Sequence, residues 1–303
     1  MFPIVDAHHH LWEPGEERYP WMHAGVAKFM GPTAPVCTRY DIESFCREVD
    51  SSGDLHLLAS VHLQCGRRPE DPAEETAWVQ QQASRAGLPM AIVGYADLAD
   101  PELESLLNAH LQCAGFRGVR QMLNWHEHVD RYRLCERGDF LVDAAWRRGY
   151  ARLGERGLTF DLQVNPWQLE AAANLARDHP QTTMVVNHAG LPFDNNEARR
   201  AWHCGMAALA DQPQVFVKFS GLGMIDPHWT AASVRPLFNE LLRLFGAHRI
   251  MFGSNFPIDR LYKQYAEIFS IYRTLTEGLD ETQRMDLFHR TASRVYRLET
   301  TGP

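Results

Sequence analysis

Apolar segments rich in β-branched and aromatic residues alternate with stretches of helical period from one end of the chain to the other. Eight strand candidates can be counted, and each is followed by a helical stretch. They cover residues 4–10, 57–64, 90–98, 115–123, 158–164, 183–189, 215–221 and 250–255. Because repeated strand–helix units build parallel sheets, eight of them in 303 residues predict one α/β domain, a (β/α)8 TIM-like barrel over residues 1–303.

The segment 13–38 breaks this alternation, because it has no clear period. It carries Trp21, Met22, Phe29 and Met30 between glycines and prolines. We expect a long loop after the first strand, which in a barrel would cover the site. Its apolar residues fit a lid and a subunit contact equally well, so the sequence leaves open whether the chain forms a homo-oligomer.

The composition of the chain limits which kinds of partner it can bind. The formal net charge is −8 and charged residues make up 22% of the chain, so no basic face is expected and nucleic acid is excluded as the main partner. No apolar run approaches the ~20 residues of a membrane span, and no leader precedes the first strand. The 6 cysteines lie far apart and are typical of reduced thiols. We expect a cytoplasmic protein that acts on a small molecule.

Polar residues recur at the C-terminal ends of the predicted strands, which is where a TIM barrel carries its site. Strands that only pack would not need them, because burying an unpaired polar group costs ~1–3 kcal/mol. Along the chain these residues are His8 and His10, His62 and Gln64, Arg117 and Arg120, Asp161 and Gln163, Asn187 and His188, Lys218 and Ser220, and Asn255. Together they predict a ring of site residues at one mouth of the barrel.

The run V-D-A-H-H-H-L-W contributes the first two of these residues. Side chains two positions apart on a strand point to the same face, so His8 and His10 could reach one ion while His9 points away. Two neutral imidazoles suit Zn, and also Mn, Fe or Ni. A surface histidine cluster or a purification tag are the alternatives, although Asp6 and Trp12 flank the run instead of linker residues.

Six segments in this order carry a resemblance to the amidohydrolase superfamily, in particular to its amidohydrolase-related branch of sugar lactonases and 2-pyrone-4,6-dicarboxylate lactonase. They read V-D-A-H-H-H-L-W, G-F-R-G-V-R, F-D-L-Q-V-N-P-W-Q-L, V-V-N-H-A-G-L-P, V-F-V-K-F-S-G-L and R-I-M-F-G-S-N-F-P. Each is weak alone, but six on successive strands are specific. The resemblance implies a TIM-like barrel and hydrolysis of a small lactone or related carbonyl compound, with or without a divalent metal, Zn being favoured.

Several site roles follow from this resemblance. His8 and His10 match the first-strand histidine pair and His188 matches the later histidine, so the three would form the imidazole cluster or hold the metal. Arg117 and Arg120 fall in the segment that supplies cationic contacts to substrate carboxylates. The remaining substrate contacts are expected from Gln163, Trp125 and His126. Lys218 lies in an apolar strand, where a role at the site or a buried ion pair must explain it.

The eighth strand departs from the pattern. The superfamily usually ends it with Asp as general base, whereas this chain has Asn255, whose amide cannot accept a proton usefully near neutral pH. Asp259, His62 and His188 are candidate substitutes, although Asp259 is equally suited to satisfying backbone N–H groups at a helix start. His62 has a suitable ordinary pKa and a position at a strand end.

Three functions remain open at this stage. The first is hydrolysis of a small cyclic ester, with water attacking a carbonyl polarised by the histidine cluster or its metal. The second is decarboxylation of an aromatic or unsaturated acid on the same barrel. The third is binding without catalysis on an inherited barrel, which Asn255 favours and the three histidines oppose.

Overall fold

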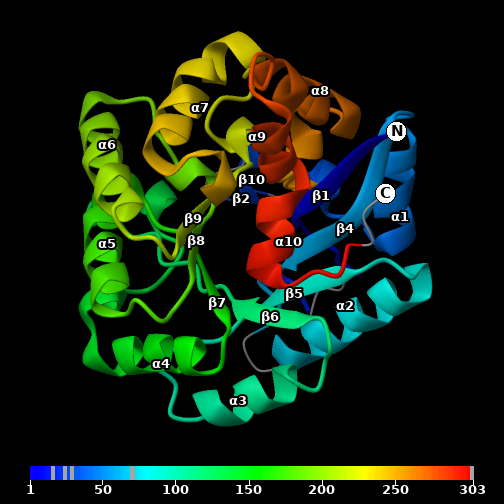
Figure 1. Ribbon diagram of the computed structural model, residues 1–303. Coiled ribbons are helices and arrows are strands. Elements are labelled where there is room, and N and C mark those ends of the chain that lie inside the picture. Colours follow the sequence, from blue (N-terminus) through cyan, green and yellow to red (C-terminus); the bar gives the residue numbers. More distant parts are fainter. Residues whose placement is uncertain (15–17, 23–25, 28–30, 69–71, 301–303) are drawn as a thin grey trace.

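Eight parallel strands form a barrel in which each strand pairs with the next one along the chain (Figure 1). The computed structural model describes residues 1–14, 18–22, 26–27, 31–68 and 72–300. The strands are β1 (Phe2–His9), β4 (Leu55–Leu63), β5 (Met90–Gly94), β6 (Phe116–Val119), β7 (Thr159–Leu162), β8 (Met184–Val186), β9 (Val215–Phe219) and β10 (Ile250–Phe252). The ends of β1 and β10 close the ring, since His10 N–H donates to the Phe256 carbonyl and Asn255 N–H to the His8 carbonyl, both at 2.7 Å.

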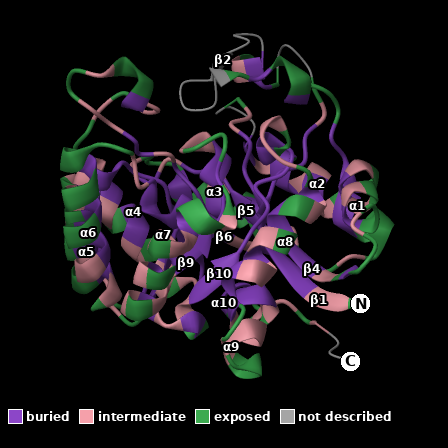
Figure 2. Cartoon of the chain, turned by 90° about the horizontal axis from the view of Figure 1, so that it is seen from above, coloured by how far each residue is buried: buried purple, intermediate pink, exposed green. Residues whose placement is uncertain are grey.

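Helices surround the barrel, and one follows each strand. These are α1 (Ile42–Asp50), α2 (Pro72–Ala86), α3 (Leu103–His110), α4 (Ala144–Glu155), α5 (Leu169–Asp178), α6 (Asn196–Ala210), α7 (Ala231–Phe245) and α8 (Tyr265–Leu275). Their inner faces are buried against the strands and their outer faces are exposed (Figure 2). Side-chain N-caps start several of them, such as Asp41 before α1 and Thr230 before α7. The predicted TIM-like barrel is therefore confirmed.

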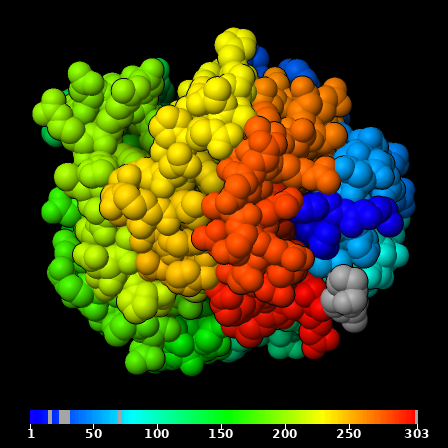
Figure 3. Space-filling model, turned by 45° about the horizontal axis from the view of Figure 1, so that its top comes forward, coloured from blue at the N-terminus to red at the C-terminus, as the bar shows by residue number. Residues whose placement is uncertain are grey.

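The C-terminal segment closes one end of the barrel. Helix α9 (Glu281–Met285), a π-helical turn (Asp286–Arg290) and α10 (Thr291–Tyr296) follow α8. Ala292, Val295 and Tyr296 belong to the same buried cluster as the strand residues Val5 and Val93, so α10 fills the interior from below. In Figure 3 this orange-to-red segment lies across the middle of the visible face. We call this closed end the floor and the opposite end, where the strands finish, the mouth.

The strands stop earlier than the sequence predicts, most clearly at the mouth. The eighth predicted strand runs to residue 255, but β10 ends at Phe252. Both Asn255 and His188 have left-handed backbone, with φ of 58° and 52°. Such a conformation turns the chain out of the strand ladder and is concentrated at functional sites in proteins.

The loop predicted over 13–38 is partly described. It contains short 3-10 turns at Pro20–Met22 and Ala34–Val36 and a small antiparallel pair, β2 (Val26–Ala27) and β3 (Gly31–Pro32). Figure 2 shows β2 at the opposite end of the barrel from α9, which is the mouth. Phe29 and Met30 lie outside the described residues. Among the helices that the structure describes, none combines the length and apolarity needed to cross a bilayer.

Candidate active site

A cavity of about 760 Å³ opens at the mouth of the barrel. Its wall combines the polar residues that follow the strands with aromatic residues from the connecting loops. The polar group comprises His10, Gln64, Arg120, Gln163, His188 and Asn255, and the aromatic group includes Trp12, Trp21, Tyr95 and Phe140. A mostly apolar wall with a few convergent polar groups is the usual form of a small-molecule site.

Three imidazoles lie together beside this cavity; His10 and His188 line it, and His8 is buried behind them. The His8 ring centroid is 4.5 Å from that of His188 and 5.1 Å from that of His10. Burial lowers the pKa of each ring well below its ordinary value. The charge of Arg120 adds to the effect on all three rings, and that of Lys218 adds to it on His8 and His188. The cluster is therefore neutral, and neutral imidazole is the form that accepts a proton or binds a metal.

Hydrogen bonds set which imidazole nitrogen keeps its lone pair. Nδ1 of His10 lies 2.8 Å from the Leu63 carbonyl oxygen, which can only accept, so Nδ1 carries the proton and Nε2 keeps a lone pair. Nδ1 of His188 pairs with the Ser220 hydroxyl at 3.1 Å, which leaves Nε2 outside that bond. Neither ring nitrogen of His8 has a hydrogen-bond partner among the described residues.

Arg120 brings a buried positive charge to the wall of the cavity. Its Nη1 donates to Gln163 Oε1 at 3.2 Å and its Nη2 donates to the Gln64 carbonyl, but Nε has no partner in the described part of the chain. No carboxylate pairs with this guanidinium within the same described residues, although only 4% of the side chain is exposed. A buried charge without a counter-ion is costly, so an anionic or carbonyl oxygen of a ligand would be strongly favoured here.

Asn255 faces the cavity from the turn after β10, and Asp259 lies behind it. Asn255 Nδ2 donates to Asp259 Oδ1 at 2.8 Å, and the Gly223 backbone N–H helps to lower the pKa of this carboxyl group. Burial raises the pKa of Asp259 to about 7, while the bond from Asn255 opposes the rise. Asp259 belongs to the 3-10 turn Ile258–Leu261 and is not part of the cavity wall.

Lys218 is explained by a buried ion pair. Its Nζ lies 2.7 Å from Asp161 Oδ1, and neither side chain is exposed. The Tyr296 hydroxyl of α10 donates to both oxygens of Asp161, at 2.8 and 3.0 Å. Burial lowers the pKa of Lys218 to about 8, and Asp161 opposes that shift. Lys218 is not part of the cavity wall, so it acts on the imidazoles through its charge and not by contact with a ligand.

The structure does not bring every predicted site residue to the cavity. Arg117 lies at the floor, where Nε donates to the Tyr296 carbonyl and Nη1 to the Ala114 and Phe116 carbonyls. Residues three apart on a strand differ in height and face, which is why the two arginines separate. We leave Arg117 out of the proposed site.

Trp125 and His126 are also absent from the cavity wall. The Trp125 carbonyl accepts from Trp167 Nε1 at 2.7 Å, and His126 Nδ1 accepts the backbone N–H groups of His128 and Val129. Both residues organise the loop after β6. Their predicted substrate contacts therefore have no support in this arrangement.

His62 is buried beside the cluster but does not reach the cavity. Its Nδ1 accepts the Leu11 backbone N–H at 3.1 Å, so in the neutral ring Nε2 carries the proton. No lone pair is left for a base or a metal. His62 instead holds the turn after β1, and with it the position of His10.

Two groups of side chains can be compared as candidate metal ligands, by asking whether their lone pairs are free. Among the described residues, His62, Cys65 and Glu75 are the one His/Cys/Asp/Glu trio whose candidate ligand atoms all lie within 4.8 Å of one another. That trio fits poorly, because His62 has no free lone pair and Glu75 Oε1 already accepts the Cys65 N–H at 2.9 Å. The cluster of His8, His10 and His188 fits better chemically, since its lone pairs are uncommitted, but its rings would have to draw together.

Sequence reasoning missed part of the wall. Tyr95 and Asp97 come directly after β5 and line the cavity, and their place after an apolar strand was a signal that could have found them. Asp97 Oδ1 accepts from Gln121 Nε2 at 3.1 Å, and Gln121 also lines the cavity. Phe140 and Arg137 come from the long connection before α4, where no sequence pattern marks them.

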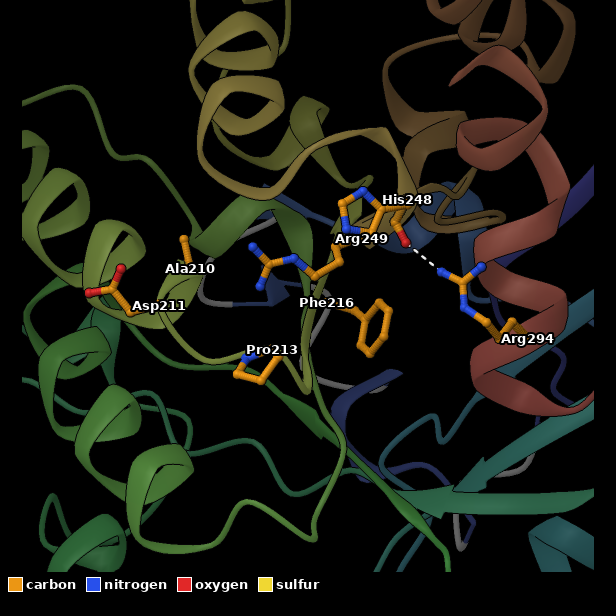
Figure 4. A pocket seen from close by; sticks show the side chains of 7 residues that line it. All are labelled: Ala210, Asp211, Pro213, Phe216, His248, Arg249 and Arg294. Carbon is orange, nitrogen blue, oxygen red and sulfur yellow. Dashed lines mark hydrogen bonds between the residues drawn. The ribbon is translucent and has the colours of Figure 1, made fainter. Parts of the chain in front are cut away.

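A second hollow of about 500 Å³ lies at the floor, beside β9 (Figure 4). Arg249 and Arg294 point toward it, but both guanidinium groups already donate to backbone carbonyls. Arg249 bonds those of Gln212, Leu244 and Phe245, and Arg294 bonds that of His248. Because these cations are satisfied by the chain itself, the hollow has no counterpart of the under-bonded groups at the mouth.

Comparisons with known proteins identify the family of this chain. The sequence profile of the amidohydrolase family matches residues 5–298. The chain belongs to the amidohydrolase family. Among amidohydrolase relatives, the protein y4mH of Sinorhizobium fredii is 38% identical over 296 residues, covering 97% of this chain and 98% of that protein.

Two further relatives come from Burkholderia multivorans. A protein named L-fucono-1,5-lactonase is 28% identical over 307 residues, covering 97% of this amidohydrolase and 96% of the relative. A crystal structure of an amidohydrolase with bound zinc superposes with a TM-score of 0.80 at 27% identity, covering 97% of this chain and 99% of that one. The similarity extends over the whole barrel.

Proposed function

We propose that this amidohydrolase hydrolyses a small lactone to the corresponding hydroxy acid. The observation that carries the proposal is the convergence of neutral imidazoles and a buried, incompletely bonded Arg120 on one cavity. The relatives named lactonases support the same class of substrate. Aromatic walls and the amide groups of Gln64, Gln163 and Asn255 suit a compact ring that carries hydroxyl groups.

The reaction requires a proton acceptor and stabilisation of negative charge. The oxygen of a water attacks the lactone carbonyl carbon while His188 accepts the water's proton, and the C–O bond to the ring oxygen then breaks. The proton returns to the leaving alkoxide, so the product is one hydroxy acid. Arg120 donates to the oxyanion that forms on the carbonyl oxygen and then to the product carboxylate.

His8, His10 and His188 are the residues that would hold a divalent metal. A bound Zn²⁺ supplies Lewis acidity toward a carbonyl oxygen and lowers the pKa of water. The buried, neutral state of the three rings prepares them for this role as well as for proton transfer.

The test combines elemental analysis of the purified protein with an activity screen over sugar lactones and aromatic lactones. We expect acid release from at least one sugar lactone and a decrease in kcat of roughly 10²–10⁴-fold in His188→Ala. Unchanged turnover of every accepted lactone in His188→Ala would contradict the mechanism. His203→Ala, an exposed histidine on α6, is the matched control and should behave as wild type.

The same screen separates the rival reactions. A decarboxylase would release carbon dioxide from aromatic or unsaturated acids and would release no acid from lactones. A binding protein would retain ligands without turning any of them over.

A further inference from the structure

Asn255 and Asp259 form a buried pair in which only one member reaches the cavity. Asn255 lines the cavity and is held by its backbone, whose N–H donates to the His8 carbonyl at 2.7 Å. Its side-chain Nδ2 donates to Asp259 Oδ1 at 2.8 Å. Asp259 is 1% exposed, and within the described residues no lysine or arginine pairs with it.

The donors around Asp259 decide which way the Asn255 amide points. Because burial raises the pKa of Asp259 to about 7, its carboxylate is ionised above that pH. An ionised carboxylate only accepts, so it selects the NH2 side of the amide and turns the carbonyl oxygen Oδ1 away from itself. The backbone N–H of Gly223 favours the ionised form of the same carboxyl group. No donor from the described part of the chain bonds Asn255 Oδ1, which leaves this oxygen free to accept from a ligand in the cavity.

We propose that Asp259 is a positioning residue that fixes the Asn255 amide with its oxygen directed to the cavity, where it accepts a hydrogen bond from the attacking water or a substrate hydroxyl. This proposal rests on the lactone hydrolysis proposed above. Asn255 supplies the lone pair, and Asp259 supplies the negative charge that orients and polarises the amide from behind.

The substitution Asp259→Asn would reverse this arrangement. The new amide would have a single oxygen, and the Gly223 N–H that favours the carboxylate would favour this oxygen on its own side, so the NH2 group would face Asn255. The Asn255 amide would then turn over, bringing its oxygen to position 259 and its NH2 group to the cavity. The site would present a donor where it had an acceptor, with almost no change in volume.

The experiment measures kcat and KM for Asp259→Asn, Asn255→Asp and the exchanged double variant on the lactone that wild type turns over best. We expect kcat to fall roughly tenfold to hundredfold in Asp259→Asn, with KM changed by less. The double variant places a carboxylate at 255 and an amide at 259, so an acceptor again faces the cavity. It should recover at least tenfold in kcat over Asp259→Asn.

The control is Asp280→Asn, because Asp280 Oδ1 accepts the Gln283 N–H as an exposed N-cap and asparagine caps equally well. Its kinetics should match wild type. A kcat for Asp259→Asn within twofold of wild type would overturn the proposal. A double variant no better than Asp259→Asn would also overturn it, and the Asn255→Asp single variant shows how much of any recovery comes from a carboxylate at 255 by itself. If Asp259→Asn does not fold, the orientation of the Asn255 amide in wild type decides.

A second readout does not depend on activity. Neutron diffraction locates amide hydrogens, and it should show the Asn255 NH2 group facing Asp259 in wild type and facing the cavity in Asp259→Asn. If wild type hydrolyses no lactone, the proposed function fails on its own. The amide orientation then decides the positioning role, and an Asn255 oxygen facing Asp259 in wild type would overturn it.

Discussion

Two arginines on and just beyond strand β6 show how the two ends of the barrel differ. Arg117, at the floor, donates to three backbone carbonyls. Arg120, at the mouth, has a more buried side chain and still keeps Nε without a partner among the described residues. Because folding normally satisfies buried donors, the incomplete bonding of Arg120 supports the proposal that a ligand binds there.

The same contrast extends to neighbouring strands. On the side of the barrel interior that faces α10, Lys218 and Asp161 form a buried ion pair, and the Tyr296 hydroxyl of α10 donates a hydrogen bond to Asp161. At the mouth, both ring nitrogens of His8 and both side-chain polar atoms of Asn187 lack partners within the described chain. The polar groups without partners at the mouth are therefore the ones that we propose to serve a ligand, whereas the Lys218–Asp161 pair is satisfied mainly within the fold.

Of the two arginines, Arg120 should have by far the larger effect on catalysis when its charge is removed. Arg120→Met keeps the side-chain length but removes the donors to the developing oxyanion, so kcat/KM should fall by roughly 10²–10³-fold. Thermal stability should change little, because an uncompensated buried charge is removed. Steady-state kinetics and thermal unfolding measure the two quantities.

Arg117→Met is the matched control. It should leave kcat/KM within about twofold and lower the free energy of unfolding by roughly 1–2 kcal/mol, from lost bonds to carbonyls. Equal kinetic losses in the two variants would show that the two ends do not differ in the way described.

Breaking the ion pair at the floor should give the largest loss of stability. Lys218→Met leaves Asp161 ionised and buried without a counter-ion, which costs about 3–5 kcal/mol. Adding Asp161→Asn should recover most of that loss, and urea unfolding of the single and double variants measures both. If the single variant lost no stability, the Lys218 charge would be serving the site and not the fold.

The periodicity of the sequence was sufficient to predict the barrel, because eight strand–helix units permit few other folds. Strand-end position also led to His188, Arg120, Gln163 and Asn255, all of which line the cavity. The assignment of these residues to roles stays a prediction. The sequence could not show that Arg117 lies at the floor and Arg120 at the mouth, because it did not fix where strand β6 begins and ends.

Other features of the site depend on contacts that a sequence does not encode locally. Asp259 is four residues from Asn255, and the sequence allowed it to be either a base or a helix-start residue. Only the left-handed turn at Asn255 and the packing of Gly223 bring the carboxylate behind the amide. Similarly, the partner of Lys218 comes from two strands earlier in the barrel, and the C-terminal helix completes that pair.

Substitution of the buried Glu75 tests whether an ionisable group near the mouth lowers the free energy of unfolding. Burial raises the pKa of this carboxyl group from 4.5 to about 7. Because the pKa of Glu75 is higher in the folded state than in the unfolded state, ionisation of Glu75 destabilises the folded protein. The stability that protonated Glu75 contributes is fully present below pH 4.5 and is lost as the pH rises through 7. Relative to Glu75→Gln, the wild-type free energy of unfolding should decrease by about 3 kcal/mol across this window.

Denaturant unfolding at a series of pH values measures this difference. The control is Glu197→Gln, an exposed residue in the first turn of α6, as Glu75 is in the first turn of α2. The difference in free energy of unfolding between Glu197→Gln and wild type should stay nearly constant across the pH series. A constant difference for Glu75→Gln as well would mean that the folded site does not raise the pKa of Glu75.

The smallest expected effect concerns one hydroxyl group at the floor. Tyr296→Phe removes the donor to the ionised Asp161, and a hydrogen bond to a charged group contributes about 2 kcal/mol. Tyr272→Phe removes a donor to the neutral Gly253 carbonyl at 3.0 Å and should cost about 1 kcal/mol. Both variants should keep the wild-type KM, because neither hydroxyl faces the cavity. A change in KM for Tyr296→Phe alone would mean that loss of this hydroxyl alters substrate binding through Asp161 and Lys218. The two ends of the barrel would then be energetically coupled.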